Sequence, residues 1–298
     1  MHGGAGRTPS AESDPSWCSL AEAGLRTALA AGGDVLACGG DALDAVVSAV
    51  RELERCEAFN AGRGCVLDAG GGVALDAAVM EGDARRAGGV IGVARIAHPV
   101  EAAVALLREG RHVLLTGSGA ERFAAECGLA LVDADHHVTA RRRAQLARVL
   151  ASARDDAGGG TVGAVARDAR GHLAAATSTG GIVARRPGRV ADSALPGCGT
   201  WADDATCAVS ATGHGEFFIR SVFAHDVDAR MRFAGRDLDT ACAEALAAVA
   251  ALGGSGGCIA LAASGGASFH FDTPAMPRGV REGDTAERIA LHGREAPA

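Results

Sequence analysis

The feature that most constrains the fold is a boundary near the middle of the chain. A charged, helix-like stretch at residues 139–154 ends there, and Asp155-Asp156-Ala157-Gly158-Gly159-Gly160 follows. Three successive glycines predict a flexible linker. Thr161 comes directly after them and opens a strand-like run at residues 161–166. The sequence therefore predicts two parts, residues 1–160 and 161–298, with a mobile linker at about 135–160.

Local patterns predict helices and strands in both parts. Apolar residues at helical spacing predict helices at 17–31, 41–54, 99–108, 120–126 and 238–252. Short apolar runs predict strands at 65–67, 72–75, 89–93, 173–178 and 206–209, and a hairpin at 258–263 and 268–271. Consecutive helices mixed with strands favour an α+β fold over strict βαβ alternation.

Charge and composition exclude several classes of partner. The net charge of −7 argues against nucleic-acid binding, and we interpret the basic run Arg141-Arg142-Arg143 as a solvated helix face. No apolar run reaches the ~18 residues that a membrane span needs, and no signal peptide is visible. The 9 cysteines form no CxxC pair, which fits reduced thiols in a cytoplasmic protein.

The chain contains no lysine, which excludes a lysine Schiff base and a lysine general base. Cleavage before Thr161 would give this residue a free α-amino group beside its own hydroxyl. Such an amine has a reference pKa of about 8 and can accept the hydroxyl proton. On this feature alone, a threonine that merely begins a strand is the commoner interpretation, and a nucleophilic threonine needs further support.

That support comes from seven motifs that occur in order along the chain. They are His2-Gly3-Gly4-Ala5-Gly6, residues 59–62, 75–82, 160–166, 176–181, 186–193 and 210–216. Together they resemble the plant-type asparaginase and isoaspartyl peptidase family of N-terminal-nucleophile hydrolases. The resemblance covers nearly the whole chain. It implies a four-layer αββα sandwich, self-cleavage into an α and a β subunit, and a dimer of such heterodimers.

The implied activity is hydrolysis of β-aspartyl dipeptides and L-asparagine, with no cofactor for catalysis. Self-cleavage would break the bond between Gly160 and Thr161, and Thr161 would then be the nucleophile, with its freed amine as the base. Thr179 would hydrogen-bond the nucleophile's hydroxyl. Thr212 and the backbone N–H of Gly213 would form an oxyanion hole, where negative charge develops.

The family's substrate-binding roles fall on four further residues. Arg189 and Asp192 would hold the substrate's α-carboxylate and α-ammonium, Gly215 would be a further substrate-binding residue, and Asn60 would fix the nucleophile's geometry. The chemistry is sensible by itself, because a zwitterionic head group needs one cation and one anion close together. Arginine can also grip a carboxylate through two parallel hydrogen bonds. An isolated Arg–Asp spacing of three residues is more often a surface ion pair.

The resemblance also implies a structural sodium ion held by backbone carbonyls. Carbonyl oxygens suit a hard cation of this kind. The matching positions are Leu53, Glu54, Cys56, Phe59, Ala61 and Arg63.

Three alternatives remain. Glycosylasparaginases share the fold, but they carry Asn-Gly where this chain has Gly180-Gly181 and Asp where it has His214. A metal-dependent amidohydrolase would need a metal motif, and His136-His137 is the only close histidine pair. The third alternative is a non-catalytic relative that only processes itself, and a turnover assay would distinguish it from an enzyme.

The beginning of the chain departs from the family pattern. Family members carry an apolar strand before the His-Gly-Gly-Ala-Gly motif, whereas here Met1 stands immediately before it. We therefore expect either a misassigned start or the loss of a core strand.

Overall fold

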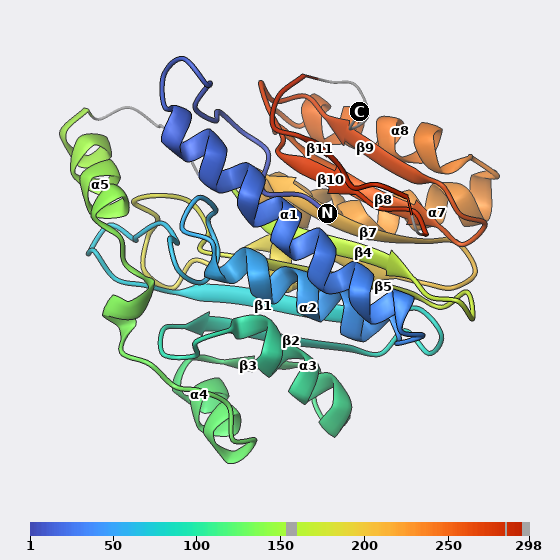
Figure 1. The fold of residues 1–298 in the computed structure, drawn as a ribbon, viewed down its shortest axis with the longest axis horizontal. Helices are drawn as coiled ribbons and strands as arrows, with labels where there is room; N and C mark the ends of the chain where they lie inside the picture. The colour runs from blue at the N-terminus through green and yellow to red at the C-terminus, as the bar shows by residue number, and fades with distance from the viewer. Residues whose placement is uncertain (153–159, 284, 294–298) are drawn as a thin grey trace.

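A computed structural model describes residues 1–152, 160–283 and 285–293 (Figure 1). The helices are α1 (Pro15–Ala37), α2 (Ala42–Arg55), α3 (Pro99–Glu109), α4 (Gly117–Glu126), α5 (Ala140–Ser152), α6 (Gly215–Ser221), α7 (Phe223–Ala234) and α8 (Leu238–Ala251), with 3-10 turns at Ala134–His137 and Asp192–Ala194. The strands are β1 (Leu75–Glu81), β2 (Ala87–Val93), β3 (Leu114–Thr116), β4 (Val162–Arg167), β5 (Leu173–Thr179), β6 (Thr200–Ala202), β7 (Cys207–Gly213), β8 (Gly256–Ala262), β9 (Ala267–Phe271), β10 (Arg278–Val280) and β11 (Arg288–Ala290).

The larger sheet joins the two halves of the chain. Its strand order is β3-β2-β1-β5-β4 among the described residues. The central pair is β1 and β5, which run antiparallel from Asp76 opposite Thr179 to Glu81 opposite Ala174. On the other side of β5, strand β4 begins with Val162 opposite Ser178. This register places the residue before Val162 at the same end of the sheet as Thr179.

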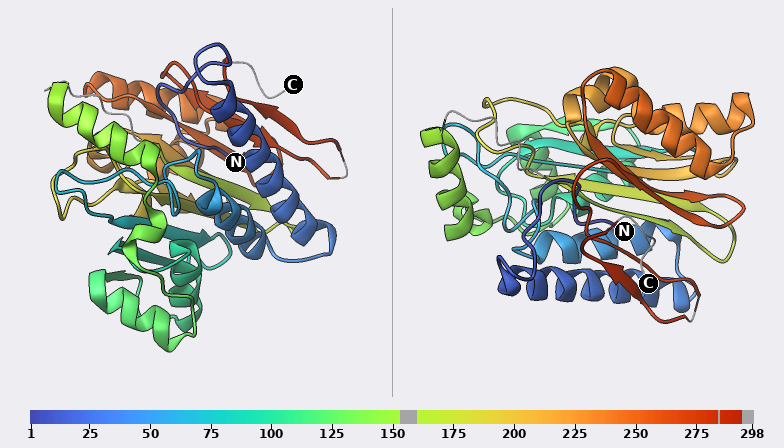
Figure 2. Two further views of the ribbon diagram at one scale, coloured as in Figure 1. Left: turned by 60° about the vertical axis from the view of Figure 1, so that its left-hand side comes forward. Right: turned by 90° about the horizontal axis from the view of Figure 1, so that it is seen from above.

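Helices and a second sheet cover the two faces of the larger sheet. Apolar side chains of α1, α2 and α3 pack with those of β4 and β5 in one core on the outer face. On the opposite face, Met80, Leu173 and Ala175 meet Ala202 and Ala208 of the second sheet. That sheet has the order β6-β7-β8-β9, and α6, α7 and α8 pack on its far face. The right-hand view in Figure 2 shows α1 and α2 on the opposite side of the sheets from α7 and α8.

Most predicted elements are confirmed, with small shifts at their ends. The helices predicted at 17–31, 41–54, 99–108, 120–126 and 238–252 correspond to α1, α2, α3, α4 and α8, and the hairpin is β8–β9. The predicted helix at 139–154 is α5 as far as Ser152. Residues 153–159, which include Gly158 and Gly159 of the predicted linker, lie outside the described residues.

The strand predicted at 65–67 is wrong, and the one predicted at 72–75 overlaps a strand only at Leu75. Residues 65–67 form a buried loop, in which the Val66 N–H donates to the Asn60 side chain at 2.7 Å and the Leu67 carbonyl accepts from the Ala184 N–H at 2.8 Å. The run is apolar because Val66 and Leu67 enter a small core with Leu146. The regular strand, β1, begins only at Leu75.

The chain's first residues lie between the larger sheet and the small β10–β11 sheet. His2 forms antiparallel bridges with Gly163 on one side and Arg278 on the other. Beyond Met1, a cavity of about 550 Å³ lies between β4 and β10, over α1 and α2. Met1 belongs to none of the strands; its amino group donates to the Gly279 carbonyl at 2.8 Å, and its carbonyl accepts from the Gly279 N–H at 3.1 Å.

None of the helices in the described part of the chain combines the length and the apolar character needed to cross a bilayer.

Candidate active site

Thr161 lies where β4 begins, and it is buried, with 6% of its surface exposed. Its hydroxyl donates to the Thr179 hydroxyl across a distance of 3.2 Å. The Thr179 hydroxyl in turn donates to the Gly160 carbonyl at 2.9 Å and accepts from the Gly181 N–H at 2.9 Å. One proton donated and two accepted satisfy this hydroxyl completely. The structure therefore brings the predicted nucleophile and Thr179 together.

Asn60 holds the peptide group before Thr161. Its side-chain nitrogen donates to the Gly160 carbonyl at 2.6 Å and to the Gly181 carbonyl at 2.7 Å. Its side-chain oxygen accepts from Val66 N–H, which fixes the amide's orientation. The Gly160 carbonyl oxygen thus faces two donors, from Asn60 and Thr179, beside the hydroxyl of Thr161.

The loop after His2 approaches this peptide bond closely. A Cβ atom at Gly4 would meet the Gly160 Cα at 2.9 Å and the Thr161 nitrogen at 3.1 Å. The φ angle of Gly4 is 108°, in the region that favours glycine. Glycine is required here both for the backbone conformation and for the close contact.

A network of buried hydroxyl groups lies behind Thr161, and the sequence did not predict it. Ser193 Oγ lies 3.4 Å from the Thr161 hydroxyl. Thr200 contacts both the Ser193 carbonyl and Thr177, which contacts Ser210 at 2.8 Å.

His2 reaches the far end of this network, with Nε2 at 3.0 Å from Ser210 Oγ. Burial lowers the pKa of His2 to about 3. The imidazole is therefore neutral at physiological pH and acts as a hydrogen-bonding group.

The two residues predicted for the oxyanion hole lie at the end of β7. Thr212 is fully buried, and its hydroxyl accepts from the Ala5 N–H at 2.9 Å. Gly213 has a φ of 150°, and a Cβ there would meet the Ser255 carbonyl oxygen at 2.5 Å. The Thr212–Ala5 contact ties the end of β7 to the same glycine-rich loop that borders Thr161.

Arg189 has a partner that the sequence did not predict. It donates two hydrogen bonds to Glu216, from Nε at 2.8 Å and from Nη2 at 2.9 Å. The arginine side chain is only 13% exposed, whereas that of Glu216 is 52% exposed. The ion-pair partner of Arg189 is thus Glu216 and not Asp192. Glu216 stands within the last motif, but it is 27 residues from Arg189 in the sequence, and no local sequence pattern predicts a contact over that separation.

Asp192 is buried beside this pair, with 3% of its surface exposed. Its Oδ2 is one of the buried side-chain atoms without a hydrogen-bond partner in the described part of the chain. Burial raises the pKa of this carboxyl to about 7, against the opposing effect of Arg189. A Cβ at Gly215 would meet Asp192 Oδ1 at 2.6 Å and Arg189 Nη2 at 2.7 Å. Arg189, Asp192 and Gly215 therefore lie close together.

Two further buried side chains hold these loops in place. Asp76 of β1 accepts from the Gly92 N–H at 2.7 Å and from the Ala191 N–H at 2.9 Å, which anchors the segment just before Asp192. Arg185 donates to the carbonyls of Gly180 and Ala74 and so fixes the turn after Thr179. Both residues stand in or beside the motifs, but their roles depend on contacts between distant segments.

The predicted carbonyl loop curls over the end of α2. Arg63 N–H donates to the Glu54 carbonyl at 2.7 Å, and Cys56 N–H donates to the Leu53 carbonyl at 3.2 Å. Each of these carbonyls keeps a second lone pair, so the donor set still suits a hard cation. No cluster of three or more His, Cys, Asp or Glu side chains within the described ranges could hold a metal ion.

The arrangement can support acyl transfer at a buried hydroxyl. It places one hydroxyl beside a polarised carbonyl, and it brings one cation and one carboxyl with an unpartnered oxygen close together. Comparisons with known proteins agree with this chemistry. A family model described as asparaginase matches residues 1–291.

Characterised relatives match along nearly their whole length. An isoaspartyl peptidase of Salmonella typhimurium is 43% identical over 290 residues, which cover 93% of each chain. The isoaspartyl peptidase of Escherichia coli is 41% identical, over 93% of this chain and 90% of its own. An isoaspartyl peptidase/L-asparaginase of Xenopus laevis is 37% identical, over 98% of this chain and 94% of its own.

Proposed function

We propose that this chain, which belongs to the asparaginase family, cleaves itself before Thr161 and then uses Thr161 as the nucleophile. The reaction is the hydrolysis of isoaspartyl peptides and asparagine. The observation that carries the proposal is the geometry at the Gly160–Thr161 bond. The Thr161 hydroxyl lies in a hydrogen-bonded row with Thr179, and Thr179 and Asn60 both donate to the carbonyl that would be attacked.

Self-cleavage would begin with attack of Thr161 Oγ on the Gly160 carbonyl carbon. The C–N bond breaks as the C–O bond forms, and the proton lost by the Thr161 hydroxyl is balanced by the proton that the Thr161 nitrogen takes up. Asn60 and Thr179 would stabilise the negative charge on the carbonyl oxygen, since both donors already point at it. Water then hydrolyses the ester, leaving a carboxylate on Gly160 and a free amine on Thr161.

In substrate hydrolysis the freed amine would take the proton of the Thr161 hydroxyl as it attacks the β-carbonyl of the aspartyl group. We assign the oxyanion hole to the Thr212 hydroxyl and the Gly213 N–H. The resulting aspartyl ester on Thr161 would be hydrolysed by water, which releases aspartate and restores the hydroxyl.

The pocket of Arg189, Asp192 and Gly215 would hold the aspartyl head group. A buried carboxyl oxygen without a partner is unfavourable, and a substrate ammonium would satisfy it. Arg189 presents its guanidinium in the same space and would bind the α-carboxylate. The absence of a side chain on Gly215 leaves room for both groups.

Three further features are part of the proposal. The helix and sheet packing supports a four-layer αββα sandwich of the N-terminal-nucleophile type. The carbonyls of residues 53–63 would bind a structural sodium ion, with no metal or other cofactor taking part in the chemistry. The processed protein would form a dimer of αβ heterodimers.

An intact-mass spectrum of purified protein tests the mechanism. We expect fragments of residues 1–160 and 161–298 for the wild type and a single uncut chain for Thr161→Ala. The processed protein should hydrolyse both β-aspartyl-leucine and L-asparagine. A smaller fragment that starts at any residue other than Thr161 would remove the base, and with it the proposed mechanism.

A further inference from the structure

A basic cleft lies beside the scissile bond, with Gly160 in its lining. Its volume is about 130 Å³. It is lined by Gly3, Gly4, Ala5, Gly6, Arg7, Thr8, Pro9, Trp17, Ala58, Phe59, Asn60, Arg141, Arg142, Gln145, Arg148 and Gly160. None of Arg189, Asp192 and Gly215 lines it, so the cleft is separate from the proposed aspartyl pocket.

The charge of the basic cleft is opposite to that of the whole protein. Four arginines and no Asp or Glu line it, which gives a formal charge of +4, whereas the chain carries −7. Positive charges gathered in a recess favour the binding of an anionic group there. The interpretation of Arg141-Arg142-Arg143 as a solvated helix face holds for Arg141 and Arg143, which are exposed, whereas Arg142 is part-buried.

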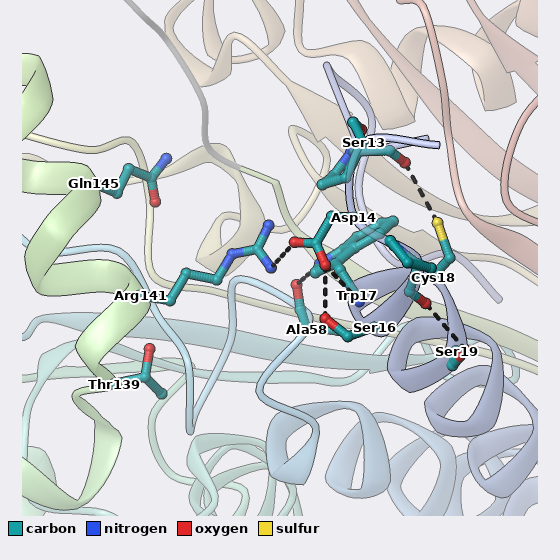
Figure 3. Close-up of polar contacts among 12 residues, drawn as sticks. Ser13, Asp14, Ser16, Trp17, Cys18, Ser19, Ala58, Thr139, Arg141 and Gln145 are labelled. Atoms are coloured by element: carbon teal, nitrogen blue, oxygen red, sulfur yellow. Dashed lines mark hydrogen bonds and ion pairs between the residues drawn. The ribbon is translucent and has the colours of Figure 1, made fainter. Parts of the chain in front are cut away.

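The four arginines are not equivalent. Arg141 pairs with Asp14 at 3.1 Å and lies over the Trp17 ring, as Figure 3 shows. Arg142 is part-buried and donates to the Gly64 carbonyl and, at 2.8 Å, to Gln145. By contrast, neither Arg148 nor Arg7 has a side-chain hydrogen bond or ion pair within the described ranges, and both are exposed. These two cations are available to a ligand.

Helix α5 presents Arg148 to the cleft. Residues 141, 145 and 148 follow one another at helical spacing and so share one face of α5. Figure 3 shows Arg141 and Gln145 projecting from α5 toward the start of α1. A helix carries its side chains in a fixed direction, which makes Arg148 the better positioned of the two available cations.

The basic cleft touches the reaction centre at two points. Gly160 and Asn60 line it, and Asn60 donates to the Gly160 carbonyl at 2.6 Å. Ala5 also lines it, and the Ala5 N–H donates to the hydroxyl of Thr212. A substrate whose aspartyl half is held by Arg189 and Asp192 would direct its leaving amine away from that pocket, toward the cleft.

We propose that the basic cleft binds the α-carboxylate of the leaving residue of a β-aspartyl dipeptide, with Arg148 and Arg7 as its counterions. The inference rests on the proposed function and deepens it, because it distinguishes two substrates with the same aspartyl half. A dipeptide releases an amino acid that carries a carboxylate, whereas asparagine releases ammonia. The cleft thus favours peptides over asparagine.

The test compares β-aspartyl-leucine with β-aspartyl-leucine amide, which lacks the leaving carboxylate. We expect wild-type protein to prefer the free acid in kcat/KM. Arg148→Ala should lower kcat/KM for the free acid by about five- to thirty-fold, as for the loss of a hydrogen-bonded charge. The acid-to-amide ratio should then approach one. Arg7→Ala should act in the same direction, and Arg148→Lys should restore part of the preference.

Arg143→Ala is the matched control, since it removes the same charge from the same helix outside the cleft. It should leave the acid-to-amide ratio at the wild-type value. An unchanged ratio in both Arg148→Ala and Arg7→Ala, with turnover intact, would overturn the assignment of the cleft alone. Wild-type protein that hydrolyses none of asparagine, the dipeptide and its amide would instead overturn the proposed function.

Discussion

Arg189 is the residue at which substrate binding can be separated most clearly from folding and self-cleavage. Its guanidinium is largely buried against Glu216 beside Asp192. Loss of one member of a buried charged pair costs about 2–5 kcal/mol. Each ~1.4 kcal/mol is tenfold, so Arg189→Ala should lower kcat/KM for β-aspartyl-leucine by roughly 30-fold to several thousand-fold. Self-cleavage involves no substrate carboxylate and should proceed at nearly the wild-type rate.

Arg186→Ala is a suitable control, because Arg186 is exposed and three residues away. It should retain nearly full activity. An Arg189→Ala variant that works within a factor of about three of wild type would reduce Arg189 to a surface ion-pair residue. A variant that fails to process would make it a structural residue.

Asp192 should make the unliganded protein less stable as the pH rises. Burial raises its pKa to about 7 from the usual value near 4, so the folded state holds the proton more tightly than the unfolded state does. Its contribution to stability is complete below about pH 4 and is lost as the pH rises through about 7. Asp192→Asn, which cannot ionise, should therefore raise Tm at pH 8 by about 2 °C or more, and should hardly change it at pH 4.

Thermal unfolding at pH 4 and pH 8 measures this effect, with the exposed Asp133→Asn as control. The same Asp192→Asn variant should lose most of its turnover, since it lacks the anion for the substrate ammonium. Equal Tm values for wild type and Asp192→Asn at pH 8 would show that the carboxyl has a partner when ionised.

At the scale of elements, the sequence predicted helices and strands correctly where their residue patterns are local. Amphipathic spacing identified α1, α2 and α3, and the glycine pair at 265–266 identified the β8–β9 hairpin. It failed at residues 65–67, because a buried loop carries the same apolar run as a strand. It also missed the contacts of Glu216, Ser193 and Asp76, since each depends on segments that only the fold brings together.

The loop of residues 3–6 should control the rate of self-cleavage. Gly4→Ala would place a Cβ 2.9 Å from the Gly160 Cα, so the loop and the scissile peptide must shift relative to each other, which disturbs the contacts with Thr179 and Asn60. Strain of this kind costs about 1–3 kcal/mol, and processing should slow by roughly five- to a hundred-fold. Time-resolved gel analysis of freshly purified protein would measure the rate.

Gly39→Ala provides the matched comparison. Gly39 also has a positive φ, 76°, but a Cβ there would meet nothing within 4 Å. The Gly39→Ala variant therefore has the backbone strain without the close contact, and its self-cleavage should proceed at the wild-type rate. Equal rates for Gly4→Ala and wild type would show that the close approach has no part in cleavage.

At the scale of the whole molecule, the proposed cut falls at a place where the two products cannot simply separate. Strand β1 belongs to the first product and pairs along its length with β5 of the second. His2 bridges Gly163 and Arg278 of the second product. One hydrophobic core combines α1 and α2 with β4 and β5. This pairing is non-local, and neither the strand order nor the shared core could be predicted from residue patterns alone.

We therefore expect the fragments of residues 1–160 and 161–298 to remain together after cleavage. Separation would expose the edges of β1 and β5 and the apolar face beneath α1 and α2, at a cost comparable to unfolding. On native size exclusion both fragments should elute in one peak, and a denaturing gel of that peak should show two bands. In urea they should dissociate only as the fold is lost, in one transition followed equally by circular dichroism and by fragment separation. Residues 161–298 expressed alone should lack a stable fold, because β5 and β4 would have neither β1 nor the covering helices. Fragments that separate in native buffer with their secondary structure intact would contradict the shared core, and with it the view that the two products form one domain.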